Sequence, residues 1–181
     1  RDLREGVMSI RMIPMSVVFS RFPRMVRDLA ASLGKRVSLQ TIGADTELDK
    51  GLIENIVDPL THLVRNALDH GIERPEERIA AGKDAGGTIV LRSSHQSGNV
   101  VIEVIDDGRG LDREKILARA RAQGLAASAE MADSDVWQLI FAPGLSTVEQ
   151  VTDVSGRGVG MDVVKRNISA IGGRVEVASQ R

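Results

Sequence analysis

The sequence contains no cysteine in its 181 residues. This absence excludes disulfide bonds, zinc sites built on thiolates and a cysteine nucleophile, and it fits a reducing cytoplasm. No apolar run approaches the length of a membrane span, and no signal-peptide pattern is visible at the start. We therefore expect a cytoplasmic protein that does not insert directly into a membrane.

The formal net charge is −1 at pH 7, so the overall charge does not favour nucleic acid or an anionic membrane as a partner. Locally, Arg21, Arg24 and Arg27 recur at helical spacing and could contact the phosphates of a nucleic acid. Acidic residues elsewhere balance them, and aromatic residues that would stack on bases make up 2% of the chain. We interpret this face as a solvated or interdomain surface and expect no nucleic-acid partner.

The length suffices for one domain with a sizeable core and is short for two. Because the chain begins at Arg1 rather than methionine and ends at Arg181 just after a strand-like pattern, we interpret it as a piece of a longer protein. Residues 1–13 have a short, mixed pattern typical of the tail of a helix or a linker. Pro14 interrupts any helix there, because proline lacks an N–H donor.

Hydrophobic periodicity and turn residues predict an alternation of helices and strands. Helices are expected at Val17–Leu33, Leu48–His70, Pro75–Ala81, Arg113–Gln123, Ser134–Phe141 and Val159–Ile171. Strands are expected at Arg36–Ile42, Thr88–Ser93, Asn99–Ile105 and Arg174–Ala178. Pro23 predicts a kink or fresh start in the first helix, Pro59 an interruption of the second, and the aperiodic stretch Leu145–Ser155 a mobile loop. This order favours a two-layer α/β sandwich in which helices cover one face of a mixed sheet.

The strand expected at 99–105 leads directly into an acidic, glycine-rich run. Its alternate apolar residues share one face, and the next position on that face is Asp106, followed by Gly108 and Gly110. A carboxylate at the mouth of the core is costly unless it is paired. It can accept a hydrogen bond from an exocyclic amine such as adenine offers, while the glycines let a ligand approach the backbone. A structural aspartate in a polar turn remains an alternative for this motif alone.

A second glycine run, Gly156, Gly158 and Gly160, stands immediately before an expected helix. The free N–H groups and the dipole of a helix N-terminus favour phosphate. The spacing matches neither the dinucleotide-binding fingerprint nor a P-loop. By itself, the run is explained equally well by a flexible hinge.

A third constellation lies in the expected helix from Leu60 to His70, whose apolar residues form a core-facing stripe. His62, Asn66 and His70 follow one another at intervals of four residues, so they form one ridge at the edge of that stripe. An amide oxygen and a neutral imidazole one turn apart suit a phosphate-bound Mg²⁺, which needs only one or two protein ligands. Half-buried structural histidines are the alternative, and the position of the ridge argues against it.

These constellations occur together in the order used by the GHKL ATPase superfamily, and the chain resembles the CheA family of chemotaxis histidine kinases over nearly its whole length. The resemblance rests on four segments: Arg11–Asp28, His62–Glu73, Ile140–Thr147 and Val154–Lys165. They are similar to the family's entry segment, asparagine box, phenylalanine box and second glycine box. The resemblance implies the GHKL (Bergerat) fold with a mobile ATP lid.

The resemblance also implies domain boundaries. Residues 1–13 would be the tail of a preceding dimerisation helix or a linker, and residues 14–181 the ATP-binding histidine kinase domain. The family's sheet continues to a further strand beyond the position of Arg181, so we expect the last strand to be missing.

For the asparagine box, the resemblance implies a metal and phosphate site. Asn66 would hold Mg²⁺ between the nucleotide phosphates with His70 as its helper, and His62 would approach the γ-phosphate. Lys115 and Arg119, one turn apart on the helix after the aspartate motif, would face the polyphosphate.

The other motifs are expected to complete the ATP site. Asp106 would bind the adenine amine, and Gly108 and Gly110 would line the base and the sugar. The remaining nucleotide-binding positions implied by the resemblance are Asp69, Ser146, Thr147, Gly156, Gly158, Val159, Gly160 and Met161.

Superfamily members that hydrolyse ATP carry a glutamate one helical turn before the asparagine, as the general base for water. His62 occupies that place here, which favours a kinase that keeps the γ-phosphate for an imidazole. The resemblance implies an ATP-dependent protein-histidine kinase in two-component chemotaxis signalling, whose acceptor histidine lies on a separate phosphoacceptor domain, reached in trans within a dimer. The parent protein's partners would include the receptor-coupling adaptor CheW and response regulators. A GHKL ATP hydrolase and a non-catalytic nucleotide-binding scaffold remain alternatives.

Overall fold

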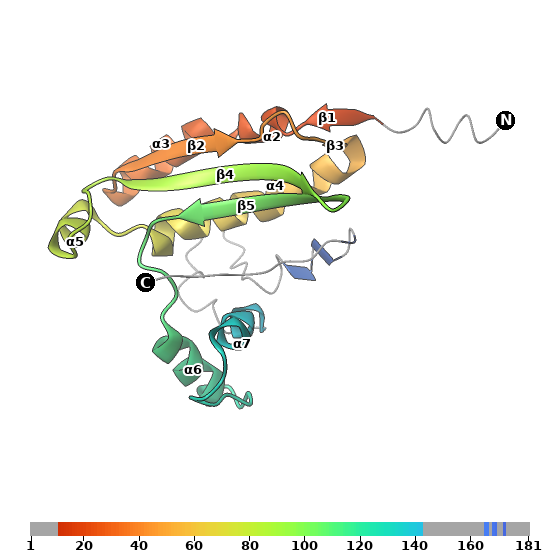
Figure 1. Ribbon diagram of the computed structural model, residues 1–181. Coiled ribbons are helices and arrows are strands. Elements are labelled where there is room, and N and C mark those ends of the chain that lie inside the picture. Colours follow the sequence, from red (N-terminus) through yellow and green to blue (C-terminus); the bar gives the residue numbers. More distant parts are fainter. Residues whose placement is uncertain (1–10, 143–164, 167, 170–171, 173–181) are drawn as a thin grey trace. The chain divides into compact units, whose positions relative to one another are not determined.

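The computed structural model describes residues 11–142, 165, 166, 168, 169 and 172 of the chain (Figure 1). The chain divides into two compact units, residues 1–109 and residues 110–181. The loop predicted at 145–155 and the strand predicted at 174–178 lie outside the described residues. The helix predicted at 159–171 lies largely outside them, although residues 165, 166, 168 and 169 are helical.

The first unit is built on a three-stranded sheet. Its strands are β2 (Val37–Ile42), β4 (Gly87–Gln96) and β5 (Asn99–Asp106), in the order β2-β4-β5. β2 runs parallel to β4, and β4 runs antiparallel to β5, so the sheet is mixed as predicted. A two-residue turn joins β4 to β5, with φ of 51° at Ser97 and 82° at Gly98, which is the geometry that favours tight hairpins.

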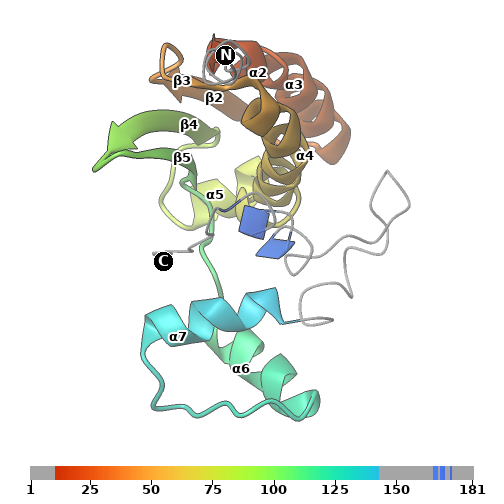
Figure 2. The same ribbon diagram turned by 90° about the vertical axis from the view of Figure 1, so that its right-hand side faces the viewer.

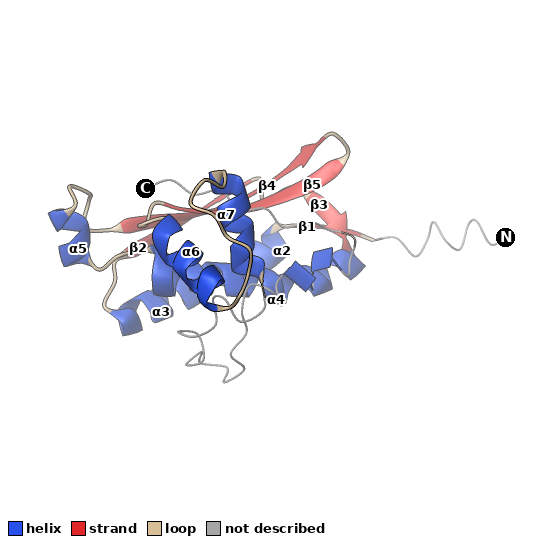
Figure 3. Cartoon of the chain, turned by 90° about the horizontal axis from the view of Figure 1, so that it is seen from below, coloured by secondary structure: helices blue, strands red, loops and turns tan. Residues whose placement is uncertain are grey.

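Helices cover one face of this sheet. The helical elements of the first unit are α2 (Ser16–Phe19), α3 (Phe22–Leu33), α4 (Lys50–Asn66), the π-helical turn η1 (Ala67–Gly71) and α5 (Pro75–Ala80). Figures 2 and 3 show α3 and α4 on the same side of the strands. On β4 the buried positions alternate, and Ile89 and Leu91 are fully buried between sheet and helices. The two-layer α/β arrangement with helices on one face, expected for a GHKL fold, is therefore confirmed.

The two prolines within the predicted helices behave differently. Pro23 lies in the first turn of α3, so the predicted fresh start there is confirmed. Pro59 lies inside α4, which continues through it, so the predicted interruption is wrong. Ile56 and Leu60 on either side of Pro59 are buried, and this packing offsets the single backbone hydrogen bond that proline removes.

The structure contains a short antiparallel pair of strands that the sequence patterns did not predict. β1 (Met12–Pro14) pairs with β3 (Glu47–Asp49), and three residues a strand are too few to show alternation. The helix predicted to begin at Leu48 therefore begins at Lys50, since Leu48 belongs to β3. Asp49 caps α4 by accepting a hydrogen bond from the Gly51 N–H at 3.4 Å.

The second unit contains α6 (Arg113–Ala122), α7 (Asp133–Gln138) and the 3₁₀ turn η2 (Leu139–Phe141) in its described part. Asp112 caps α6, because its carboxylate accepts from the N–H groups of Glu114 and Lys115. In the chain segments that the structure describes, no helix is long and apolar enough to cross a membrane.

Candidate functional site

The asparagine-box helix ends in a π-helical turn that the sequence did not predict. α4 stops at Asn66, and η1 carries Asp69 and His70. Lys35, just after α3, holds this turn from the side: its Nζ donates to the carbonyl of Leu68 at 2.6 Å and to that of Asp69 at 2.9 Å. Burial, together with the nearby charge of Arg109, lowers the pKa of Lys35. π turns inside or at the end of helices are frequent at functional sites.

The predicted core-facing stripe is largely confirmed, since Leu60 and Val64 on α4 and Ala67 at the start of η1 are buried. His62 and Asn66 are half-buried and lie one helical turn apart, as predicted. His70 is exposed, and its α-helical spacing from Asn66 is wrong, because it lies in the wider π turn. The amide oxygen of Asn66 and the imidazole of His70 remain chemically suitable ligands for a phosphate-bound Mg²⁺.

Asp106, Gly71 and Gly108 form one close-packed corner. A Cβ atom on Gly71 would lie 3.2 Å from Asp106 Oδ1, and one on Gly108 would lie 2.8 Å from the same oxygen and collide with the Gly71 carbonyl. The Gly108 N–H donates to Asp106 Oδ1 at 2.8 Å, and the Arg109 N–H donates to the Gly71 carbonyl at 2.9 Å. The end of the asparagine box thus packs directly against the aspartate motif, two segments about 35 residues apart in the sequence.

The carboxylate of Asp106 is solvent-accessible rather than buried at the mouth of the core, which corrects the expectation from the strand pattern. The reason is that β5 is an edge strand of the described sheet, and its apolar residues from Val100 to Val104 are only half-buried. Desolvation by the packed glycines and their neighbours nevertheless raises the pKa of Asp106, and the nearby charge of Asp107 acts in the same direction. Among described residues, Oδ2 receives no hydrogen bond, so it is available to a ligand.

A buried ionic cluster that the sequence reading missed lies behind this corner. Arg78 on α5 is 2% exposed and donates to Glu73 Oε1 at 3.0 Å, while Lys83 donates to Glu73 Oε2 at 2.8 Å. Burial would raise the pKa of Glu73, but the hydrogen bonds from Lys83 and the backbone and the charges of Lys83 and Arg78 outweigh it, so the pKa is lowered. Arg78 also donates to Asp107 Oδ2 at 3.2 Å. A charged residue in a short helix gives no sequence signal of burial.

The predicted phosphate-facing residues of the second unit lie together on α6. Lys115 is exposed and Arg119 is half-buried, one turn apart, and Gly110 precedes the helix with a φ of 75°. Their roles in the ATP site stay predictions. The other predicted nucleotide-binding residues lie outside the described residues: Ser146, Thr147, Gly156, Gly158, Val159, Gly160 and Met161.

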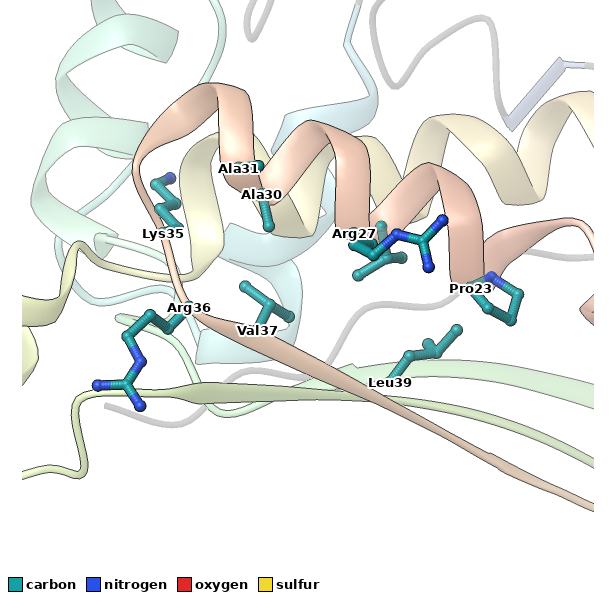
Figure 4. A pocket seen from close by; sticks show the side chains of 9 residues that line it. Pro23, Arg27, Ala30, Ala31, Lys35, Arg36, Val37 and Leu39 are labelled. Atoms are coloured by element: carbon teal, nitrogen blue, oxygen red, sulfur yellow. The ribbon is translucent and has the colours of Figure 1, made fainter.

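A cavity of about 460 Å³ lies between α3 and β2, lined by residues that include Arg27, Lys35 and Val37 (Figure 4). Of the predicted site residues that lie within 11–142, none lines it. Its link to the candidate site is indirect, through Lys35, whose ammonium group holds the π turn. We therefore assign the candidate site to the corner around Asp106 and the asparagine box, and not to this cavity.

Replacing Gly108 by alanine tests the close-packed corner. The new methyl group would collide with the Gly71 carbonyl, so the free energy of unfolding should fall by about 1–3 kcal/mol. Chemical denaturation measures this change. Gly51→Ala is the matched control, because its nearest neighbour, Asp49 Oδ2, would lie 3.7 Å away and alanine favours a helix. A Gly108→Ala protein as stable as the unsubstituted chain would contradict the packing.

Comparison with known proteins identifies a family whose sequence model matches most of this chain. The family model described as "Histidine kinase-, DNA gyrase B-, and HSP90-like ATPase" matches residues 55–181. This range includes the asparagine box, the π turn and the aspartate motif.

Two curated relatives are similar over nearly the whole chain, and both are named "Chemotaxis protein CheA". The protein from Salmonella typhimurium is 66% identical over 181 residues, which is 100% of this chain and 27% of that protein. The protein from Klebsiella aerogenes is 68% identical over 180 residues, 99% of this chain and 28% of that protein. The chain thus spans about a quarter of the length of these relatives. Among solved structures, the Erythrobacter litoralis EL346 blue-light activated histidine kinase matches with a TM-score of 0.48 and 17% identity, covering 93% of this chain and 38% of that one.

Proposed function

Because the chain belongs to the family of histidine kinase-, DNA gyrase B- and HSP90-like ATPases, we propose that it binds Mg-ATP and donates the γ-phosphate to a histidine on a separate phosphoacceptor domain. The high identity to two CheA proteins supports chemotaxis signalling as the setting. The observation that carries the proposal is the corner in which Gly108 and Gly71 pack against the Asp106 carboxylate, whose Oδ2 receives no hydrogen bond from the residues that the structure describes.

Asp106 is the group that binds adenine in this proposal. Its Oδ1 is occupied by the Gly108 N–H, so its orientation is set, and Oδ2 can accept a hydrogen bond from the exocyclic amine. The same carboxylate disfavours a 6-oxo purine, because two acceptors would then face each other. Gly108 and Gly110 leave room for the base and the sugar next to the backbone.

The phosphates are proposed to be bound with the help of Asn66, His62 and His70. The Asn66 amide oxygen and the His70 imidazole suit Mg²⁺, which, when bound, neutralises charge between the phosphates. His62 is proposed to approach the γ-phosphate, and Lys115 and Arg119 are proposed to add positive charge. In the transfer, the acceptor imidazole nitrogen forms a bond to the γ-phosphorus while the bond from that phosphorus to the β–γ bridging oxygen breaks, and ADP leaves.

A supplied phosphoacceptor domain provides the test. Incubated with γ-labelled ATP and Mg²⁺, the purified chain should label the acceptor with acid-labile phosphate and should itself remain unlabelled. Stoichiometric acid-labile phosphate on the chain itself would overturn the assignment of the acceptor to a separate domain. Release of inorganic phosphate as the main product would favour the hydrolase alternative, in spite of His62. Undetectable binding of Mg-ATP at millimolar concentration would favour a non-catalytic scaffold.

The wider setting is part of the same proposal. An ATP-dependent transfer of this kind belongs in the cytoplasm, where Mg-ATP is available. We take the receptor-coupling adaptor CheW and response regulators as partners of the parent protein, on the basis of the 66% identity to a CheA protein. The proposed domain spans residues 14–181, and residues 1–13 are proposed to enter it from a preceding dimerisation helix or linker.

Trp137 offers a direct optical readout of nucleotide binding. It is the single tryptophan of the chain, lies on α7 and is 8% exposed. Because α7 precedes the segment proposed to act as the ATP lid, we expect its emission to change when Mg-ATP is added. A flat fluorescence titration, at concentrations where calorimetry records binding, would contradict this coupling.

A further inference from the structure

Two basic side chains, Arg78 and Lys83, hold the residues that directly follow Asp106. Arg78, on the six-residue helix α5, uses all three guanidinium nitrogens: Nε donates to the Asp84 carbonyl at 2.7 Å, Nη1 to Glu73 Oε1 at 3.0 Å, and Nη2 to Asp107 Oδ2 at 3.2 Å. Nη1 also donates to the Asp107 carbonyl at 3.1 Å. One buried side chain therefore ties α5, the segment after η1 and the aspartate motif together.

Lys83 reinforces the same attachment. Its Nζ donates to Glu73 Oε2 at 2.8 Å, to the Gly108 carbonyl at 2.9 Å and to the Asp107 carbonyl at 3.3 Å. Asp107 is further tied to β4, because its Oδ1 accepts from the Thr88 N–H at 2.8 Å. The carbonyl groups of the two residues after Asp106, Asp107 and Gly108, thus have defined hydrogen-bond partners.

Burying a guanidinium group costs several kcal/mol of desolvation, and a paired buried charge adds little net stability compared with apolar packing. The lowered pKa of Glu73 keeps this carboxylate charged, so the pairing persists at neutral pH. A network of this kind is better explained by the single geometry that it imposes than by the stability that it adds.

From these contacts, and resting on the proposed function of Asp106, we propose that Arg78, Glu73 and Lys83 are positioning residues for base selection. They fix residues 106–108 so that the Asp106 carboxylate faces position 6 of the purine. A rigid acceptor there accepts from the amine of adenine and repels the carbonyl of hypoxanthine. A loosened loop can turn the carboxylate aside, so it loses the favourable bond to ATP and the repulsion of ITP together.

The ratio of the dissociation constants for ITP and ATP is the readout, since a loss of fold or of phosphate contacts would weaken both nucleotides equally. For Arg78→Lys, which keeps the charge but loses the planar fork, we expect the ratio to fall at least tenfold, mainly through weaker ATP binding. In transfer assays, KM for ATP should rise by a larger factor than kcat falls. Arg74→Gln, which changes an exposed arginine at the start of α5, is the matched control and should leave the ratio unchanged.

Lys83→Gln covers the case in which Arg78→Lys does not fold, because the Lys83 side chain is 34% exposed and its loss is tolerated more easily. Its ratio should fall in the same direction. A folded Arg78→Lys or Lys83→Gln protein, checked by circular dichroism, with an unchanged ratio would overturn the positioning role. Failure of the proposed function looks different: the unsubstituted chain would then bind neither nucleotide, or bind ITP as tightly as ATP.

Discussion

Replacing Asn66 by aspartate or lysine should abolish phosphoryl transfer to a supplied histidine domain while the chain keeps its fold. Asn66 lies at the C-terminal end of α4 and is half-buried, so neither substitution places a charge in the fully buried core. Aspartate adds a negative charge beside the triphosphate, and lysine lacks an oxygen ligand for Mg²⁺. A metal contributes several kcal/mol to such a transfer, and a loss of about 4 kcal/mol corresponds to about a thousandfold in rate.

The measurement is the initial rate of acceptor labelling at saturating ATP. Asn55→Asp is the matched control, because Asn55 lies on the same helix, is exposed, and donates from its amide to the Gly51 carbonyl at 2.9 Å. The control should retain its activity. If the Asn66 variants transferred phosphate at the normal rate, Asn66 would not be the metal ligand.

The elements that the sequence predicts well are those whose cause is local. Gly34 ends α3 in the left-handed conformation, with a φ of 69°, and Asp112 caps α6 with its own side chain. The Ser97–Gly98 turn joins two strands whose alternation is legible without any tertiary contact. The same holds for the spacing of His62 and Asn66, since one turn of α-helix determines it.

Features that depend on contacts distant in sequence were not predictable in the same way. The π turn at 67–71 is stabilised by Lys35, more than thirty residues earlier in the sequence. No hydrophobic periodicity in the sequence predicts that contact. The burial of Arg78 depends on Glu73 and Asp107 lying on two other segments. α4 continues through Pro59 because the residues that flank this proline are buried. A rule that considers only the local effect of proline on a helix does not include this tertiary packing.

The corner around Asp106 combines both kinds of cause. Its residue types are visible in the sequence, but the reason that position 108 must be glycine is the carbonyl of Gly71, which the π turn brings there. The site therefore holds a partly desolvated carboxylate against backbone, an arrangement that costs stability in the absence of a ligand. Asp106 is consequently the residue at which stability and binding should respond to substitution in opposite directions.

Asp106→Asn should weaken the binding of ATP and ADP alike, by about 1.5–3 kcal/mol, or about tenfold to 150-fold, as expected for loss of a hydrogen bond to a charged group. The diphosphate and the triphosphate should be affected equally, because the contact is to the base. Calorimetry with each nucleotide measures the effect. Asp45→Asn, which neutralises an exposed carboxylate on the loop after β2, is the control and should bind both nucleotides normally. Unchanged affinity in Asp106→Asn would remove this residue from the base pocket.

The same substitution should raise the stability of the nucleotide-free chain, with a defined pH dependence. Because the folded chain raises the pKa of Asp106, the stability that this group contributes is fully present below the ordinary aspartate pKa. It is lost as the pH rises through the raised pKa of the folded state. Asparagine does not ionise, so the free energy of unfolding of Asp106→Asn, relative to the unsubstituted chain, should increase from acidic to neutral pH. Denaturation at a series of pH values measures this difference, and a difference that stayed constant or shrank with rising pH would show that Asp106 is not desolvated in the fold.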